Sequence, residues 1–281
     1  MLQMLRWAVE EYLSMPILLV KMLIANQRKK KGIRVEKIYF GKDHGQYVLF
    51  FHSDDRRKRN KLIFFVHGGG WIFGLPDIYR FIGYFFARTG YPAILVGHRS
   101  SLFHKFPDQL EDIEKGLRKS LEKLGMGEWK TLKIILCGHS SGGQLAALMA
   151  LNGEKDPIVC REQLSGVITL GAPLDLSAKR NYFIKKLVKL LVKNSMKWHQ
   201  ANPIEQIHGK EEIPFFCIHG KKDTILGMDQ AANFVEKYNQ YNGDLGKLFI
   251  AENLHHSDMI QIFLSGRTET KAVLEWIQER E

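Results

Sequence analysis

The stretch LKIILCGHSSGG, residues 132–143, decides the fold, because it joins an apolar run directly to a turn made of small residues. The apolar run has the length and composition of a strand covered on both faces, and a helical pattern follows at about 141–152. GHSSG, residues 138–142, therefore predicts a sharp strand-to-helix turn of the Gly-x-Ser-x-Gly type, in which larger side chains would collide with the strand or the helix. Such a turn exposes the Ser140 hydroxyl at a helix N-terminus, where developing negative charge is favoured.

Strands and helices alternate on both sides of this turn. Short apolar runs separated by helical patterns predict βαβ units, and hence a mainly parallel sheet. The expected strands are 34–40, 46–52, 61–66, 91–98, 132–138, 166–171, 214–220 and 247–252, of which the first two form a hairpin, and the other expected helices lie at about 77–89, 107–124, 227–240 and 267–280. An α/β chain of 281 residues is expected to form one domain.

The first 33 residues are apolar but differ from a membrane-spanning segment. Glu10, Glu11 and Lys21 interrupt them, so that no run approaches the roughly 20 apolar residues needed to cross a bilayer. A run of positive charges follows the apolar stretch at 28–31, whereas a signal peptide carries its charges in front. We therefore expect one or two amphipathic helices in residues 1–33, packed on the body or lying on a membrane surface.

Residues 176–200 form a helical insertion that breaks the alternation of strands and helices. Lysines recur in this segment every four residues, and apolar side chains occupy another side. The lysines are Lys185, Lys189, Lys193 and Lys197, and the apolar residues are Phe183, Leu187, Leu190 and Leu191. We interpret the segment as a helix over the core or a lid, two roles that are compatible, and assign residues 34–281 to the main domain.

The net charge and the cysteine content indicate which partners and which cellular compartment to expect. Lys and Arg exceed Asp and Glu by 11, but no nucleic-acid-binding motif accompanies this excess, so we expect no nucleic-acid partner. Cys137, Cys160 and Cys217 are odd in number and too few for a disulfide framework. We therefore expect free thiols in a cytoplasmic protein, with a peripheral membrane contact through 1–33 or 176–200 left open.

A second cluster of glycines follows the strand at 61–66. His67-Gly68-Gly69-Gly70-Trp71 presents backbone N–H groups that a ligand can approach closely, as an oxyanion hole requires. A phosphate-binding loop would need a Lys-Ser/Thr pair or the spacing of a dinucleotide fingerprint, and this loop has neither. The loop therefore predicts the second half of a nucleophile site, with a plain turn as the remaining alternative.

The HGGGW and GHSSGG motifs make the chain resemble the acetyl-esterase and hormone-sensitive-lipase-like branch of the α/β-hydrolases, over roughly residues 60–280. A further family segment is similar to His98-Arg99, Phe106-Pro107 and Glu111-Asp112, although His98, Leu102 and Phe103 replace the expected Tyr, Pro and Glu.

This resemblance implies an α/β-hydrolase fold, with helices on both faces of a mostly parallel central sheet and a small helical cap. It also implies that the backbone N–H groups of Gly69, Gly70 and Ser141 form the oxyanion hole.

The catalytic acid is expected after Ser140 along the chain, and before the histidine. Asp223 follows the predicted strand 214–220, at the edge of the sheet where such folds place their chemistry. The family places its acid in a similar Gly-x-x-Asp setting. Asp229 and Asp175 are the competing candidates.

The catalytic histidine is expected after the last predicted strand. The sequence LHHSD, residues 254–258, offers two adjacent histidines, which cannot both face Ser140. The resemblance favours His256 over His255, because the family frequently shows His, one residue, Asp and then an apolar residue, as at 256–259.

Together these residues predict hydrolysis of a small-molecule carboxylic ester. His256, held in one tautomer by Asp223, would take the proton of Ser140 as the hydroxyl attacks the carbonyl, and water would then cleave the acyl-enzyme. Compact loops favour a short acyl chain, such as acetyl or butyryl. We expect no cofactor, and the histidines lack a zinc-ligand spacing such as H-E-x-x-H. The alternatives are an amide-cleaving relative (a formamidase or small peptidase) and a non-catalytic binding protein.

Overall fold

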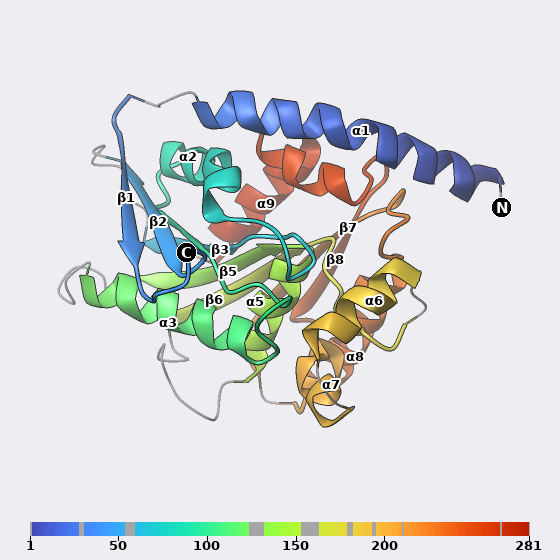
Figure 1. Cartoon of the computed structure of the whole chain (residues 1–281). Coiled ribbons are helices and arrows are strands. Elements are labelled where there is room, and N and C mark those ends of the chain that lie inside the picture. The colour runs from blue at the N-terminus through green and yellow to red at the C-terminus, as the bar shows by residue number, and fades with distance from the viewer. Residues whose placement is uncertain are drawn as a thin grey trace.

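The computed structural model describes residues 2–27, 31–53, 60–123, 132–152, 163–178, 182–192, 195–209, 211–264 and 266–280. Within them, one eight-stranded sheet has the strand order β1-β2-β4-β3-β5-β6-β7-β8 (Figure 1). The strands are β1 (Ile33–Tyr39), β2 (Tyr47–Ser53), β3 (Lys61–Val66), β4 (Ala93–Val96), β5 (Lys133–His139), β6 (Leu164–Leu170), β7 (Phe215–Gly220) and β8 (Gly246–Ala251). β3 to β8 are parallel, and β2 is antiparallel to β1 and β4. The predicted α/β fold with a mostly parallel sheet is confirmed.

The central strands are buried because they are apolar on both faces. Every residue of β3 is buried, and its side chains alternate between the cores on the two sides of the sheet. The register pairs Phe65 with Cys137 and Val66 with Gly138, so β3 and β5 end side by side. The two glycine-containing loops therefore begin as neighbours at the carboxyl edge of the sheet, where open α/β sheets bind ligands.

Helices cover both faces of the sheet (Figure 1). They are α1 (Leu2–Gln27), the 3₁₀ helix η1 (Pro76–Tyr79), α2 (Arg80–Arg88), α3 (Asp108–Lys123), α5 (Ser141–Leu151), α6 (Tyr182–Leu191), α7 (Ser195–Ala201), η3 (Pro203–Gln206), α8 (Asp229–Asn242), η4 (Ser257–Phe263) and α9 (Thr268–Gln278). α1, α2, η4 and α9 pack on one face, and α3, α5, α6 and α8 pack on the other. The two layers and the ends of these helices lie close to the predicted ones.

The N-terminal segment forms one long helix, α1, which lies across one face of the molecule (Figure 1). It packs on η1, α2 and η4. Its inner side buries Leu18 and Met22, whereas Tyr12, Leu13 and Ile17 on its outer side are more than half exposed. Within the described residues, no helix is both long and apolar enough to cross a membrane.

The insertion at 176–200 contains the short helices α6 and α7. Residues 179–181 and 193–194, including Lys193, and the side chain of Phe183 lie outside the described part of the chain. Leu187 and Leu191 are buried as the pattern predicts, but Leu190 is 37% exposed. The reason is helix geometry, because each residue advances about 100° around the axis and Leu190 therefore leaves the buried side.

Candidate active site

Ser140 lies on the turn between β5 and α5, in a backbone conformation that L-residues rarely adopt. Its φ is 51° and its ψ is −124°, and its N–H donates to the Leu170 carbonyl over 2.9 Å. A Cβ at Gly142 would lie 2.2 Å from the carbonyl oxygen of Val66, so glycine alone lets α5 approach β3 this closely. The turn has the strained shape that exposes a serine hydroxyl.

The structure brings Ser140, His256 and Asp223 into one line of hydrogen bonds. His256 Nε2 lies 2.9 Å from Ser140 Oγ, and His256 Nδ1 lies 2.8 Å from Asp223 Oδ2. When Nδ1–H donates to the carboxylate, Nε2 presents its lone pair to the serine hydroxyl. The three residues follow β5, β8 and β7 respectively, so the carboxyl edge of the sheet collects them from distant parts of the chain.

Asp223 is buried, and its two carboxylate oxygens have separate partners. Oδ1 accepts hydrogen bonds from the N–H groups of Ile225 and Leu226, at 3.0 and 2.7 Å. Oδ2 contacts His256 and also lies 3.2 Å from His219 Nε2. Burial by itself would raise the pKa of Asp223, but attraction to His256 and the hydrogen bond from His219 hold that pKa well below its ordinary value. The acid is therefore a carboxylate at neutral pH.

The two adjacent histidines have different partners. Burial by itself would lower the pKa of His256, but the Asp223 carboxylate raises it above the ordinary value of 6.5. His255 instead lies 3.0 Å from Asp258 through Nδ1 and 3.6 Å from Glu10 through Nε2. Because the backbone of His256 is already helical, at φ −55° and ψ −53°, the two side chains leave it in different directions.

The competing acids are engaged elsewhere. Asp175 accepts hydrogen bonds from the Ser177 N–H and from the Asn233 side chain, and Asp229 begins α8. In the described part of the chain, the carboxylate bonded to His256 is that of Asp223.

The loop after β3 has a backbone shape that requires glycine. Gly69 has φ 133° and Gly70 has φ 63°, and a Cβ at Gly69 would lie 1.9 Å from the Phe73 carbonyl oxygen. Both glycines line the same pocket as Ser140, and so does Ser141, the first residue of α5. N–H groups in the first turn of a helix have no carbonyl partner within that helix, so the N–H of Ser141 can donate to a ligand.

Trp71 connects the loop after β3 to helix α5, which follows Ser140, by a hydrogen bond. It is buried with φ 62°, a conformation that a bulky residue holds only when its surroundings impose it. Its Nε1–H donates to Gln144 Oε1 over 3.0 Å, and Gln144 Nε2 donates to the Ala201 carbonyl over 2.6 Å. The glycine loop, α5 and the end of α7 are thereby held in one arrangement.

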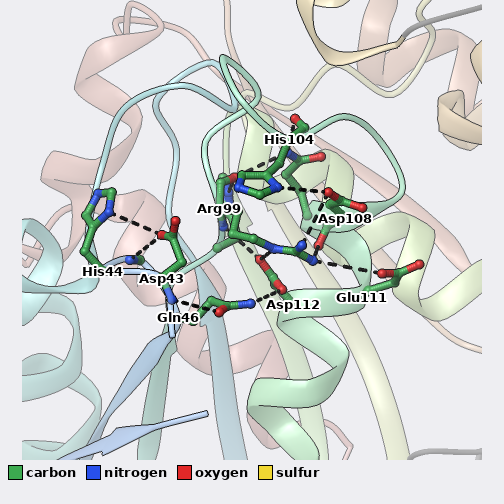
Figure 2. A network of polar contacts seen from close by, with 11 residues as sticks. Asp43, His44, Gln46, Arg99, His104, Asp108, Glu111 and Asp112 are labelled. Atoms are coloured by element: carbon green, nitrogen blue, oxygen red, sulfur yellow. Dashed lines mark hydrogen bonds and ion pairs between the residues drawn. The ribbon is translucent and has the colours of Figure 1, made fainter. Parts of the chain in front are cut away.

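A polar network supports the same loop from α3 (Figure 2). Arg99 donates from Nε to Asp112 Oδ2 over 2.8 Å, and Asp112, which is 1% exposed, also accepts from Gln46 Nε2 over 2.7 Å. Two residues after Arg99, the N–H of Ser101 donates to the Trp71 carbonyl over 2.9 Å. Arg99 and Asp112, two residues of the family-like segment, therefore pair in the structure and position the loop that carries Trp71.

An apolar pocket of about 340 Å³ opens beside Ser140. Leu18 and Met22 of α1 line it, and so do Ile184 and Leu187 of α6. The N-terminal helix and the inserted helix thus form two walls of one pocket. A pocket of this size is at the small end of those that bind organic ligands.

Two residues around the site were not identified from the sequence. His219 stands at the end of β7, four residues before Asp223, and this position at the carboxyl end of a strand was the available signal. Glu11 comes from α1 and contacts both loops that carry the acid and the histidine. Its helical spacing from Leu18 and Met22 could have placed it on the buried side of the helix.

The chain is similar to a known family and to several esterases. A family model described as BD-FAE matches residues 49–238. Esterase LipC of Mycobacterium tuberculosis is 24% identical over 231 residues, which cover 75% of this chain and 56% of that protein. The chain spans about half the length of the curated relatives that it matches over most of its own length.

Solved structures with low sequence identity share the fold. Esterase B from Lactobacillus rhamnosis, inhibited by a C4-C4 SN3 tributyrin phosphonate, is 18% identical with a TM-score of 0.77, covering 99% of this chain and 94% of that one. A hormone-sensitive lipase from a metagenome library is 17% identical with a TM-score of 0.73, covering 93% of this chain and 91% of that one. These likenesses show the α/β-hydrolase fold.

Proposed function

The chain belongs to the BD-FAE family, and we propose that it is a carboxylic ester hydrolase with Ser140 as nucleophile, His256 as base and Asp223 as supporting acid. The observation that carries this proposal is the line of hydrogen bonds from Asp223 through His256 to Ser140, at 2.8 and 2.9 Å, beside an apolar pocket. The esterases to which the chain is similar support the class of reaction.

In the proposed reaction, His256 Nε2 takes the proton of Ser140 while Oγ attacks the carbonyl carbon of the ester. Asp223 keeps Nδ1 protonated and stabilises the imidazolium that forms. The N–H groups of Gly69 and Gly70, with that of Ser141, donate to the carbonyl oxygen as it becomes negative.

The second half of the reaction uses the same groups in reverse. The imidazolium of His256 gives its proton to the departing alcohol, leaving the acyl group on Ser140 Oγ. Water then enters, loses a proton to His256 Nε2 and attacks the acyl carbon. The bond between the acyl carbon and Ser140 Oγ then breaks, the imidazolium of His256 returns its proton to Oγ, and the carboxylic acid leaves.

We also propose that the acyl group is short, such as acetyl or butyryl. The pocket of about 340 Å³ supports this proposal, because Leu18 and Leu187 bound it and leave room for a small group. The tributyrin phosphonate on the similar Esterase B is a C4 ligand of that protein and supports the same range.

Covalent trapping tests the proposed nucleophile. A p-nitrophenyl alkylphosphonate should modify a single peptide, the one that contains Ser140, and p-nitrophenyl acetate hydrolysis should be lost in step with labelling. Ser140→Ala should prevent labelling, whereas Ser120→Ala, in α3, should label like the unchanged protein. Labelling at another residue, or esterase activity that survives complete labelling, contradicts the proposal.

Matched substrates test the reaction class. p-Nitrophenyl acetate should be cleaved much faster than p-nitroacetanilide, because the ester has the better leaving group. A faster reaction with the anilide, or with N-formyl compounds, favours the amide-cleaving alternative.

We propose further that the protein is cytoplasmic and touches anionic membranes through α1. The buried free thiols of Cys137 and Cys217 support a reducing compartment, and Cys160 lies outside the described residues. The exposed apolar side of α1, on a chain with a formal charge of +11, supports contact with anionic lipid. Phosphatidylserine-containing vesicles should sediment the protein, less so in high salt or after Leu13→Asp. Equal recovery in the supernatant with and without vesicles contradicts the contact.

A further inference from the structure

Helix α1 carries a buried carboxylate to the neighbours of the catalytic acid and base. Glu11 is 0% exposed. Its Oε2 accepts hydrogen bonds from the Thr224 hydroxyl at 2.8 Å and from the Thr224 N–H at 3.3 Å, and its Oε1 accepts one from the Ser257 N–H at 3.2 Å. Thr224 directly follows Asp223, and Ser257 directly follows His256. One carboxylate therefore joins the two loops that hold the acid and the base.

The helix is held so that this carboxylate has a fixed position. Leu18 and Met22, on the same side of α1 as Glu11, are buried against the body. Further along, Asn26 Nδ2 donates to the Ile78 carbonyl over 2.7 Å, and Asn26 Oδ1 accepts the Phe81 N–H over 2.9 Å. The helix is thus bonded to the body at both ends of its buried side, at Glu11 and at Asn26.

Attachment of the helix does not by itself explain a glutamate here. Burying a carboxylate is costly unless hydrogen bonds compensate for the lost water, and apolar residues attach α1 at the next positions of the same stripe. Thr224 and Ser257 supply three donors to Glu11, which compensate the carboxylate for the water it loses and fix it to both loops.

We propose that Glu11 is a positioning residue for the hydrolytic reaction. It holds the loops of Asp223 and His256 in fixed positions relative to each other and places a second negative charge near the base. This inference rests on the proposed function and adds to it the requirement that α1 be docked for full activity.

The groups that face His256 come from several elements. Asp223 bonds its Nδ1, and Glu11 of α1 bonds the N–H of the next residue, Ser257. His139, at the end of β5, has its ring centroid 5.4 Å away, and burial lowers its pKa to about 3, so it is neutral in the working range. His219 contacts Asp223. Burial opposes the charged form of His256, while Asp223, and then Glu11, raise its pKa.

Glu11→Gln tests the proposal, because it keeps the size of the side chain and removes its charge. We expect kcat for p-nitrophenyl acetate to fall about 10- to 100-fold, as a misplaced base produces. KM should change little, because other residues of α1, such as Met15 and Leu18, line the pocket. The acid limb of kcat/KM should move to lower pH, since one of the two anions that stabilise protonated His256 is gone.

Glu10→Gln is the matched control on the same helix. Glu10 is partly exposed, and within the described part of the chain its partners Arg6 and His255 make no side-chain hydrogen bond to His256 or Asp223, so the same loss of charge there should leave kcat and the acid limb unchanged. Thr224→Val is the second variant, for use if Glu11→Gln folds poorly. It removes the 2.8 Å hydrogen bond but keeps the Glu11 charge, so kcat should fall while the acid limb stays in place.

A titration of His256 by NMR separates this inference from the proposed function. Imidazole signals of labelled histidine report the pKa of His256 whether or not any ester is hydrolysed, and Glu11→Gln should lower that pKa in both cases. If the unchanged protein hydrolyses no ester but the pKa still moves, the proposed function fails and the charge coupling stands. An unchanged acid limb and an unchanged His256 titration in folded Glu11→Gln overturn the inference, even if thermal stability falls.

Discussion

The serine side and the acid–base side of the site are held by different means. Ser140 is placed by its own turn, where φ is 51° and Gly142 lets α5 approach β3. Asp223 and His256 stand 33 residues apart, and side chains from elsewhere join their loops. The bonds from Glu11 to these loops span 213 and 246 residues of sequence.

This difference indicates how each side should respond to change. A turn whose shape is set by glycines and by neighbouring strands depends on backbone packing and not on a charged side chain. Loops joined by a carboxylate depend on the charge and the length of that side chain. Substitutions around Ser140 should therefore either abolish kcat or leave it unchanged. Substitutions around Asp223 and His256 should lower kcat by intermediate amounts that depend on pH.

Loss of the nucleophile should have the largest effect. Ser140→Ala should lower kcat for p-nitrophenyl acetate on the order of 10⁶-fold, because removing a triad nucleophile leaves only the oxyanion hole and substrate binding. The melting temperature should change little, since Ser140 Oγ bonds only with His256 among the described contacts. A variant that keeps more than a small fraction of the wild-type rate would falsify the assignment.

The two adjacent histidines should differ sharply. His256→Ala should be nearly as damaging as Ser140→Ala, because it removes the base that bonds both Asp223 and the serine. His255→Ala should be mild, since His255 bonds Asp258 and contacts neither Ser140 nor Asp223 in the described contacts. Measured kcat values for the two variants decide which histidine is the base. If His255→Ala lowers kcat more than His256→Ala, the role of base belongs to His255.

Next in size is the effect of a methyl group in the glycine loop. Gly69→Ala places a Cβ 1.9 Å from the Phe73 carbonyl oxygen at φ 133°, so the loop must move and its N–H groups with it. We expect kcat to fall about 10²- to 10³-fold, the loss typical of one oxyanion donor. Gly266→Ala is the control, because a Cβ there meets no atom within 4 Å. Equal activity of the two variants would remove Gly69 from the oxyanion hole.

The pH dependence of kcat/KM should follow the protonation of His256. Only the neutral imidazole accepts the serine proton, and its pKa is raised, so kcat/KM should fall as the pH drops through a value above 6.5. The stability that His256 contributes has the opposite dependence. A raised pKa stabilises the fold at low pH, and that contribution disappears as pH rises through the same value. A kinetic midpoint at or below 6.5 contradicts this assignment.

The smallest effect is expected at the α1 wall of the pocket. Leu18→Ala enlarges the pocket and should raise the rate for p-nitrophenyl octanoate relative to the butyrate by less than about tenfold. Leu13→Ala, on the exposed side of the same helix, is the control and should leave the ratio unchanged. An unchanged ratio in both variants shows that α1 does not limit the length of the acyl group.

Local patterns made most of the fold predictable. The turn at 138–142 and the loop at 67–71 each follow an apolar strand, and parallel register brings the ends of those strands together. Asp223 and a histidine at 255–256 could be proposed because each follows a predicted strand at the same edge of the sheet, whereas the choice of His256 came from the family resemblance. In such sheets, chain order and strand direction are enough to place the loops near one another.

Docking of the N-terminal helix was not predictable in the same way. Glu11 reads as an interruption of an apolar stretch, because its hydrogen-bond partners Thr224 and Ser257 are more than 200 residues away. Which side of an amphipathic helix faces inward depends on tertiary packing as well as on periodicity. Leu190 shows the same limit, since its position at the edge of the stripe leaves it 37% exposed.

The bond between Glu11 and the Ser257 N–H has a consequence for synthesis in the cell. α1 leaves the ribosome before the segment that completes the site, and 246 residues at 5–20 residues per second take roughly 12 to 50 s. During that time α1 can pack on η1 and α2, which are made early, but Glu11 and the part of the helix that packs on η4 have no partner, and contacts of such long sequence separation form slowly. The proposed active site is therefore complete only once the chain through η4 has been made, and a chain that stalls before η4 leaves the side of α1 around Glu11 without part of its packing surface.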